Sequence, residues 1–413
     1  MSIILFLVFL FLIDIYFFQA VLSISKSWSS VPKNIALYGF WSVSVLTLMA
    51  IVWYFYGDPY RYTTQVRNFI MVVVFMNYFS KLFAVLFLLI DDIQRGTRMV
   101  MRWMNKGVAG ELPGETITRS DFLMKTAMVA AAVPFTGMAY GILSGAHDYR
   151  VRRKTVYLPN LPASFDGITI GQLSDIHSGS FFDRKSVMGG IELFNMEKPD
   201  MVFFTGDLVN NATSEVRDYT NIFDKVKAPL GVFSVTGNHD YGEYKSWESP
   251  QAKQKNFQDL IAVHKQMGFD LLMNENRFIE INGERIAVLG IENWGAGRFS
   301  KYGKMDLAYA GTEEAPIKLL LSHDPSHWDA QVRENYKDID ITFAGHTHGF
   351  QFGVEIGDFK WSPSQYAYKQ WAGLYTEEHQ HLYVNRGFGF LGYPGRVGMP
   401  PELTIITLKR GTA

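Results

Sequence analysis

The hydrophobic residues of this chain are distributed in two different ways. In the first third they form four long runs with few charges, at residues 3–22, 35–56, 69–90 and 122–143. A helix needs roughly 20 apolar residues to cross the hydrocarbon core of a bilayer. Beyond residue 148 the apolar runs are short and are bounded by Gly, Pro, Asn and Asp, as strands are. The pattern predicts an all-α region of four transmembrane helices at 1–147 and a soluble domain at 148–413.

Two of the predicted membrane helices carry a charge near the middle. Asp14 and Lys81 lie at similar depths in the first and third helices, which run in the same direction. A charge inside the hydrocarbon core is costly and is usually paired. We therefore hypothesise an ion pair between these residues. The alternative is that each side chain separately faces water or a polar neighbour.

The basic residues give a narrow preference for the orientation of the helices. Loops on the cytoplasmic side carry the excess of Lys and Arg. Seven basic residues fall on one side and six on the other. The first set is Lys26, Lys33, Arg95, Arg98, Arg102, Lys106 and Arg119, and the second is Arg61, Arg67, Arg150, Arg152, Arg153 and Lys154. This favours a multi-pass membrane protein whose soluble domain is extracytoplasmic.

Two further segments bear on this topology. Residues 118–125 resemble a twin-arginine export signal in which one arginine is replaced by serine, which also favours an exported domain. In the segment from Arg95 to Lys106, basic residues recur at helical spacing. That segment is either an amphipathic helix on an anionic leaflet or an ordinary solvated loop.

Composition excludes several classes of site. The net charge is −1, which does not suggest a nucleic-acid partner. The chain contains no cysteine, so disulfides and thiolate metal sites are excluded. Any bound metal must therefore have nitrogen and oxygen ligands.

Potential metal ligands follow five of the predicted strands. These strands are residues 168–173, 201–204, 232–235, 318–321 and 339–343. In open α/β sheets, ligands bind beyond the carboxyl ends of the strands. Any single position could equally be a turn residue, but the ordered set is more specific. The residues are Asp175 and His177, then Asp207, then Asn238, His239 and Asp240, then His323, and last His346 and His348.

Other local signals complete the predicted α/β domain. Residues 185–197 and 257–267 suit helices. The segments 278–281 and 285–289 flank Asn282-Gly283, which predicts a hairpin with a type I′ turn and therefore mixed sheets. Residues 402–408 are a last strand. The histidines outside the ordered set are expected at the surface or behind the site; they are His147, His264, His327, His379 and His381. Asn210 is near the site, but a helix cap or a turn is an equal alternative.

The ordered set resembles the pattern of the calcineurin-like metallophosphoesterases. The resemblance covers about residues 156–408, and Ser174-Asp175-Ile176-His177 with the late Pro400-Pro401-Glu402 is similar to the membrane-associated bacterial branch that includes YaeI and YkuE. It implies a four-layer α-β-β-α sandwich with mixed sheets. It also implies hydrolysis of phosphate esters by hydroxide bound to two divalent ions, either Mn, Fe or Zn.

The resemblance assigns roles to the residues at the strand ends. Asp175, His177 and His348 would hold the first metal, and Asn238, His323 and His346 the second, with Asp207 bridging them. His239 would act as general acid or bind phosphate, and Asp240 would orient the His239 ring. Asn238 and Arg396 are also candidate substrate contacts, although Arg396 could be structural. Phe350 stands where the family often has a second glycine, and it could narrow the mouth of the pocket.

Several substrates and one non-enzymatic function are compatible with the sequence. An aromatic segment that includes Phe359, Trp361, Trp371 and Tyr375 follows the last histidines. It either lies at a membrane interface or packs the second sheet. If the segment lies at a membrane interface, we expect a lipid-linked phosphate ester as the substrate and the bilayer as a partner. The alternatives are a pyrophosphatase of UDP-2,3-diacylglucosamine in lipid A synthesis, and a membrane sensor without turnover. The sequence does not predict an oligomeric state.

Overall fold

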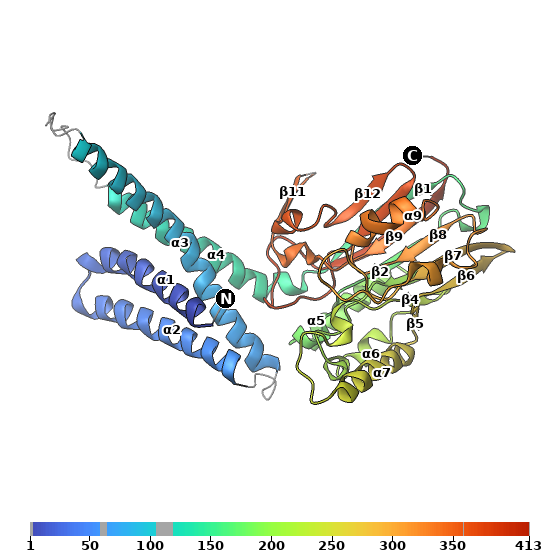
Figure 1. Ribbon diagram of the computed structural model, residues 1–413, viewed down its shortest axis with the longest axis horizontal. Coiled ribbons are helices and arrows are strands. Elements are labelled where there is room, and N and C mark those ends of the chain that lie inside the picture. Colours follow the sequence, from blue (N-terminus) through green and yellow to red (C-terminus); the bar gives the residue numbers. More distant parts are fainter. Residues whose placement is uncertain (1–2, 58–63, 105–118, 358, 413) are drawn as a thin grey trace. The chain divides into compact units, whose positions relative to one another are not determined.

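The computed structural model describes residues 3–57, 64–104, 119–357 and 359–412 (Figure 1). The chain forms two compact units, Met1–Tyr140 and Gly141–Ala413. Arg61, Lys106 and Thr118, which entered the topology argument above, lie outside the described residues. The domain boundary at residue 147 stays a prediction.

The first unit contains the long helices α1 (Ile3–Ile24), α2 (Ser30–Tyr56) and α3 (Thr64–Met104) and most of α4 (Arg119–Leu143), whose last residues from Gly141 onward belong to the second unit. Each contains a segment long and apolar enough to cross a membrane, which confirms the four predicted spans. The 41 residues of α3 correspond to roughly 60 Å of helix, about twice the hydrocarbon thickness. Residues 95–104 thus continue α3, and the solvated-loop alternative is wrong for them.

The hypothesised intramembrane ion pair is confirmed. Lys81 Nζ lies 2.6 Å from Asp14 Oδ1, and both side chains are buried. Lys81 also donates to Ser44 Oγ at 2.9 Å, while the hydroxyls of Ser44 and Tyr78 donate to the Asp14 carboxylate at 3.0 Å each. The pair connects α1 to α3, and Ser44 adds α2 to the same network.

The second unit contains two six-stranded sheets. The first has the order β1-β14-β2-β3-β4-β5 and the second β12-β13-β9-β8-β7-β6. The strands of the first are β1 (Arg150–Leu158), β14 (Glu402–Arg410), β2 (Thr169–Leu173), β3 (Met201–Phe204), β4 (Val232–Ser234) and β5 (Asp270–Leu271). Those of the second are β12 (Gly373–Glu377), β13 (Gln380–Val384), β9 (Ile341–Ala344), β8 (Lys318–Leu321), β7 (Glu284–Gly290) and β6 (Glu275–Ile281).

Parallel and antiparallel pairs occur in both sheets, as predicted. In the first sheet β2, β3 and β4 are parallel, whereas β14 runs antiparallel to β2. In the second, β7, β8 and β9 are parallel, whereas β6 pairs antiparallel with β7. The turn between β6 and β7 has positive φ at Asn282 and Gly283, which a type I′ turn requires.

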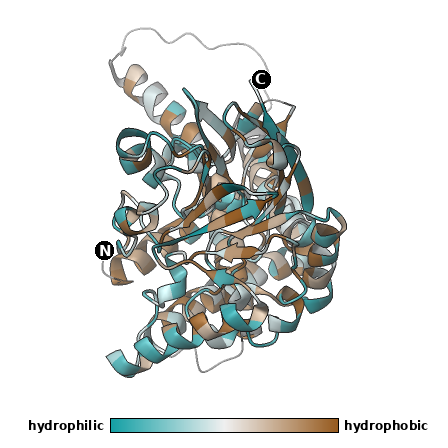
Figure 2. Cartoon of the chain, turned by 90° about the vertical axis from the view of Figure 1, so that its right-hand side faces the viewer, coloured by the Kyte–Doolittle hydropathy of each residue, from teal (hydrophilic) through white to brown (hydrophobic). Residues whose placement is uncertain are grey.

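Three apolar clusters define the four layers. The central cluster joins the facing sides of the two sheets through residues such as Phe203, Ile406, Leu319 and Phe343. On the outer side of the first sheet pack α5 (Arg184–Met196), α6 (Thr220–Phe223) and α7 (Pro250–Met267). On the outer side of the second pack α8 (Met305–Tyr309) and the turn Trp328–Val332, which leads into α9 (Arg333–Asn335). The predicted α-β-β-α sandwich is therefore confirmed, with hydrophobic residues concentrated on the central strands (Figure 2).

Two histidines expected at the surface or behind the site are instead in the core, so that prediction is wrong for them. His264 and His327 are fully buried. Their Nδ1 atoms pair with the hydroxyls of Ser234 and Ser322, each at 3.0 Å. Burial lowers the pKa of His264 to about 3 and that of His327 to about 4.

The second unit is expected to lose stability as the pH falls below about 6.5. In the unfolded chain both histidines bind protons near their ordinary pKa, whereas in the folded chain they stay neutral until much lower pH. Stability is thus fully present above the unfolded pKa and is lost as the pH falls toward the folded values. From pH 7.5 to 5 the loss is about 4 kcal/mol for the two groups. Urea unfolding of the full chain in nanodiscs measures it.

A single substitution separates this effect from general acid sensitivity. His264→Gln is expected to remove about half of the pH-dependent loss, because glutamine can still pair with Ser234 but does not titrate. His379→Gln, at an exposed position, is the control. An unchanged pH dependence in His264→Gln would contradict the prediction.

Candidate metal centre

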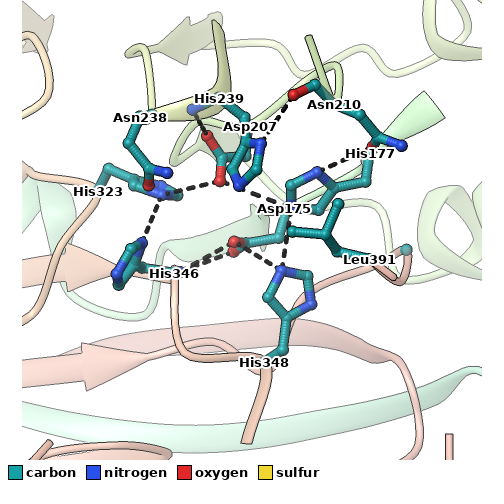
Figure 3. A network of polar contacts seen from close by, with 12 residues as sticks. Asp175, His177, Asp207, Asn210, Asn238, His239, His323, His346, His348 and Leu391 are labelled. Atoms are coloured by element: carbon teal, nitrogen blue, oxygen red, sulfur yellow. Dashed lines mark hydrogen bonds and ion pairs between the residues drawn. The ribbon is translucent and has the colours of Figure 1, made fainter. Parts of the chain in front are cut away.

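The candidate ligands converge at one edge of the sandwich. Because β2, β3 and β4 are parallel, as are β8 and β9, their carboxyl ends lie at common edges of the two sheets. Both sheets contribute to one cluster, in which side chains from five strand ends point toward one another (Figure 3). The cluster contains Asp175, His177, Asp207, Asn238, His239, His323, His346 and His348.

The side chains form two groups of potential ligands. Asp175, His177 and His348 make up one, and Asp207, His323 and His346 the other; within each group the donor atoms lie within 4.8 Å of one another. His177 Nε2 faces His348 Nε2 at 3.0 Å, and His346 Nδ1 faces His323 Nε2 at 3.2 Å. Ring nitrogens that lie this close to each other, with the Asp175 carboxylate 3.2 Å from His348 Nε2 and Asp207 3.2 Å from His323 Nε2, can share a cation. The donor set of nitrogen and carboxylate oxygen suits borderline divalent metals.

Asp207 lies between the two groups. Its Oδ2 is 3.5 Å from His177 Nε2 and 3.2 Å from His323 Nε2. Burial by itself raises the pKa of Asp207, but His323 and His239 outweigh it and lower the pKa well below the usual value. Burial is the largest single influence on His323 and lowers its pKa, but Asp207, Asp175 and the Thr205 carbonyl together outweigh it and raise the pKa to about 10. A carboxylate in this position can compensate positive charge on both sides.

Asn238 presents an unused oxygen to the second group. Its Nδ2 donates to Tyr244 Oη at 2.9 Å, whereas its Oδ1 is buried without a hydrogen-bond partner among the described residues. A buried, unpaired carbonyl oxygen is unfavourable unless something else satisfies it. The arrangement fits a ligand for a cation, and together with the facing nitrogens it shows that the residues present fit a two-metal site.

Unusual backbone conformations bring these side chains together. Asp175, His177, Asp207, His346 and His348 all have positive φ, between 48° and 69°. Such conformations cost of order 1–3 kcal/mol for residues other than glycine and cluster at functional sites. Gly345 is required for a different reason, because a Cβ there would lie 2.2 Å from Asp175 Oδ2. Because Gly345 has no Cβ, the backbone N–H of His346 can donate to both oxygens of Asp175, at 3.0 Å each.

The predicted role of Asp240 is wrong. Its buried carboxylate accepts from the backbone N–H groups of Asp207, Leu208 and Gly237 at 2.8–2.9 Å and makes no hydrogen bond with the His239 ring. His239 Nδ1 instead donates to the carbonyl oxygen of Asn210 at 2.7 Å. Asp240 therefore holds two strand-end loops together, and Asn210 orients His239.

Arg396 is not available to a substrate, so the predicted phosphate contact is also wrong. Its side chain is buried, and the guanidinium donates to backbone carbonyls of Gly389, Met399 and Arg386 at 2.5–3.2 Å. It also hydrogen-bonds one candidate ligand, His348, whose Nδ1 is 3.3 Å from an Arg396 amino group. Arg396 thus supports the loop beneath a candidate ligand.

The groups that orient the candidate histidines were largely missed by sequence reasoning. His177 Nδ1 donates to Asn210 Oδ1 at 3.2 Å, and His323 Nδ1 to the carbonyl of Thr205 at 2.7 Å. His346 Nε2 contacts Tyr368 Oη at 2.7 Å. The sequence gave a weak indication that Asn210 belongs to the site, because it is a polar residue three positions after Asp207. Tyr368 gave none, because it lies 20 residues after the last candidate ligand.

Replacing Asn210 by alanine is expected to weaken metal binding at the first group by about 10–100-fold, because His177 loses the partner that sets its orientation. The carbonyl that orients His239 is retained in this variant. Metal titration followed by elemental analysis measures the effect. Asn211→Ala is the matched control, since the Oδ1 atom of this neighbouring amide has no hydrogen-bond partner among the described residues. Equal metal affinities in the two variants would contradict the role of Asn210.

Comparisons with known proteins agree with this geometry. Residues 168–350 match the family described as "Calcineurin-like phosphoesterase". Residues 1–146 match the family described as "Probable Calcineurin-like phosphoesterase, transmembrane domain". The two matches together extend over both the predicted membrane region and most of the candidate ligands.

Individual relatives are named metallophosphoesterases, and the name of one of them also describes a transmembrane protein. The metallophosphoesterase YkuE of Bacillus subtilis is 28% identical over 304 residues, which cover 71% of this chain and 98% of the relative. The transmembrane protein with metallophosphoesterase domain of Danio rerio is 30% identical over 283 residues. That match covers 66% of this chain but only 60% of the relative's length. YkoQ of Bacillus subtilis is 27% identical over 57% of this chain and 82% of the relative. The chain therefore belongs to the calcineurin-like metallophosphoesterases, a family of metal-dependent phosphoric ester hydrolases, and to its membrane-associated branch.

Proposed function

We propose that this chain is a membrane-anchored phosphoesterase with two metal ions, and that it hydrolyses phosphate esters borne by lipids. The observation that supports the two-metal reaction is the pair of ligand groups with Asp207 between them. Asp175, His177 and His348 would hold one ion, Asn238, His323 and His346 the other, and Asp207 both. Bound there, the ions would act as Lewis acids toward a phosphate ester and water.

The protein's own groups are arranged for the remaining chemistry. His239 is the candidate general acid, because its Nδ1 is bound to the Asn210 carbonyl and its Nε2 is therefore the nitrogen available to protonate a leaving oxygen. Its ring is held between His177, at 4.9 Å between centroids, and Tyr244, at 4.5 Å. Its backbone N–H donates to Asp207 Oδ1 at 2.9 Å, which couples its position to the candidate bridging carboxylate.

The lipid nature of the substrate is supported by the four membrane helices and by exposed apolar residues next to His348. Phe350, two residues after this ligand, is 53% exposed. A substrate that resides in the bilayer would need no release into water before hydrolysis.

We further propose that the domain is extracytoplasmic at a bacterial inner membrane, as the distribution of basic residues favours.

One assay separates the substrate classes. The full chain in nanodiscs is given two soluble substrates, the diester bis-p-nitrophenyl phosphate and the monoester p-nitrophenyl phosphate. It is also given two substrates placed in the same nanodiscs, a phospholipid diester and a lipid-linked nucleoside diphosphate. Each is assayed with Mn²⁺, Zn²⁺, Mg²⁺ or chelator. Faster metal-dependent turnover of the lipid than of the soluble diester is expected. Equal rates would contradict the lipid proposal, and preference for a lipid-linked nucleoside diphosphate would favour the pyrophosphatase alternative. Tight metal binding without turnover would favour the sensor.

A further inference from the structure

A small hairpin beside the metal centre has an inverted distribution of apolar and charged residues. It consists of β10 (Val354–Ile356) and β11 (Phe359–Trp361), which pair antiparallel apart from the two large sheets. Val354 is opposite Trp361 and Ile356 is opposite Phe359, so these four side chains share one face. Ile356 is 73% exposed and Phe359 is 62% exposed.

The charged residues of the hairpin face the body of the unit instead. Glu355 accepts from Arg152 at 3.0 Å and from Arg386 at 3.2 Å. Lys360 donates to the carbonyl of Ala372 at 2.6 Å. These contacts fix which face of the hairpin points outward, and that face is entirely apolar.

Two exposed aromatic residues extend the apolar face. Tyr366 is 78% exposed, and its hydroxyl lies 3.5 Å from Trp361 Nε1. Ser362, which follows β11, donates to the carbonyl of Gly349 at 2.6 Å and so holds the hairpin against the residue that precedes Phe350. We call Phe350, Val354, Ile356, Phe359, Trp361 and Tyr366 the hairpin patch. Five of these six side chains are exposed, and Trp361 is partly exposed. Exposed apolar residues gathered in this way mark an interaction site.

The contacts of the hairpin indicate what covers this patch. Within the second unit, the carbonyl of Gly141, in the last turn of α4, accepts from the backbone N–H of Arg396 at 3.2 Å. A Cβ at Gly141 would lie 2.8 Å from both Tyr393 and Val397. Val397 in turn exchanges backbone hydrogen bonds with Gln351 and Gly353 at 2.8 and 2.9 Å. One short loop therefore contacts the end of α4 on one side and the base of the hairpin on the other.

The apolar span of α4 ends at Leu143, so the loop of residues 393–397 joins the base of the hairpin to the last turn of a helix long and apolar enough to cross a membrane. Trp and Tyr, both present in the hairpin patch, are residues that membrane interfaces favour. We propose that the hairpin patch inserts into the interface of the bilayer that holds the four helices.

This contact has a consequence for the metal centre. Phe350 belongs to the patch and is two residues from His348, so insertion would set the candidate centre at the membrane surface. The docking itself does not depend on the proposed hydrolysis. Loss of catalysis and loss of docking can therefore be observed separately.

The absence of cysteine allows a direct test on the full chain. Single variants Ile356→Cys and Phe359→Cys are spin-labelled and reconstituted in nanodiscs. For each label the collision rate is measured with oxygen, which partitions into lipid, and with a nickel complex, which stays in water. Met196→Cys is the matched control, because Met196 in α5 is also 73% exposed. Labels at 356 and 359 are expected to collide more with oxygen than with nickel, and the label at 196 the reverse.

Three outcomes would overturn the proposal. The same collision ratio at residues 356 and 196 would show that the patch is in water. Spin–spin broadening between labels at 356 would show that a second copy of the chain covers it instead. In the double variant Ile356→Glu/Phe359→Glu, a label at residue 354 is expected to shift toward nickel collisions, while turnover of a soluble diester stays unchanged. If the label at residue 354 in the double variant still collided more with oxygen than with nickel, insertion would also be contradicted.

Discussion

Replacing Asp207 by asparagine is expected to abolish metal-dependent hydrolysis, with kcat falling by about 10³-fold or more, on the scale of losing a group that stabilises the transition state directly. The carboxylate is buried between the two ligand groups and stays ionised beside His323 and His239. Asparagine has nearly the same shape and can still accept from the His239 backbone. It cannot compensate charge on two cations, so the metal content is expected to fall as well.

Two measurements together check this expectation. Turnover of bis-p-nitrophenyl phosphate by the full chain reports the reaction, and elemental analysis reports the ions bound per chain. Asp259→Asn is the matched control, since Asp259 is an exposed carboxylate paired with Lys255 on α7. Two bound ions and full turnover in Asp207→Asn would show that Asp207 does not bridge a metal pair.

Neutralising either partner of the Asp14–Lys81 pair is expected to destabilise the membrane unit by about 3–5 kcal/mol, the usual cost of leaving one buried charge unpaired. In Asp14→Asn the Lys81 ammonium would keep only neutral partners such as Ser44, and in Lys81→Met the Asp14 carboxylate would keep only hydroxyls. Water inside a bilayer is too scarce to replace the lost partner.

Unfolding of the full chain by increasing SDS in mixed micelles measures this difference. The double variant Asp14→Leu/Lys81→Met is expected to recover most of the lost stability, because it removes both charges. Lys26→Met, which removes an exposed charge next to the end of α1, is the control and should leave stability unchanged. If the single variants unfolded at the same SDS fraction as the unmodified chain, the pair would not stabilise the unit.

Contacts among distant residues were the hardest to predict. Asp14 and Lys81 could be paired because a bilayer admits few charges and fixes their depth. In the α/β unit the same reasoning failed for Asp240 and Arg396. Both carry charges at positions near the site, but their partners are backbone groups. Residue type and spacing do not show whether a side chain points to the pocket or to the loop beneath it.

The aromatic segment after His348 illustrates the same limit. The packing alternative is correct for Tyr375, which lies in β12 and packs against the apolar cluster of the second sheet. Trp371 is also buried, but in a separate small cluster with Met399. The packing alternative is wrong for Phe359, which is exposed on the separate hairpin. Aromatic composition alone could not distinguish these residues, because both environments favour large apolar side chains.

By itself the sequence determined the four spans, the α/β class with its hairpin turn, and the order of polar residues at five strand ends. Those features depend on periodicity, run length and local turn chemistry, which act over a few residues. Only the tertiary structure decided that the candidate ligands separate into two groups around Asp207, and that Asn210 rather than Asp240 orients His239. It also decided that the hairpin turns its apolar face outward. These arrangements depend on the register of strands up to about 170 residues apart, such as His348 with His177, and on left-handed backbone at five candidate ligands. Local patterns carry no information about either.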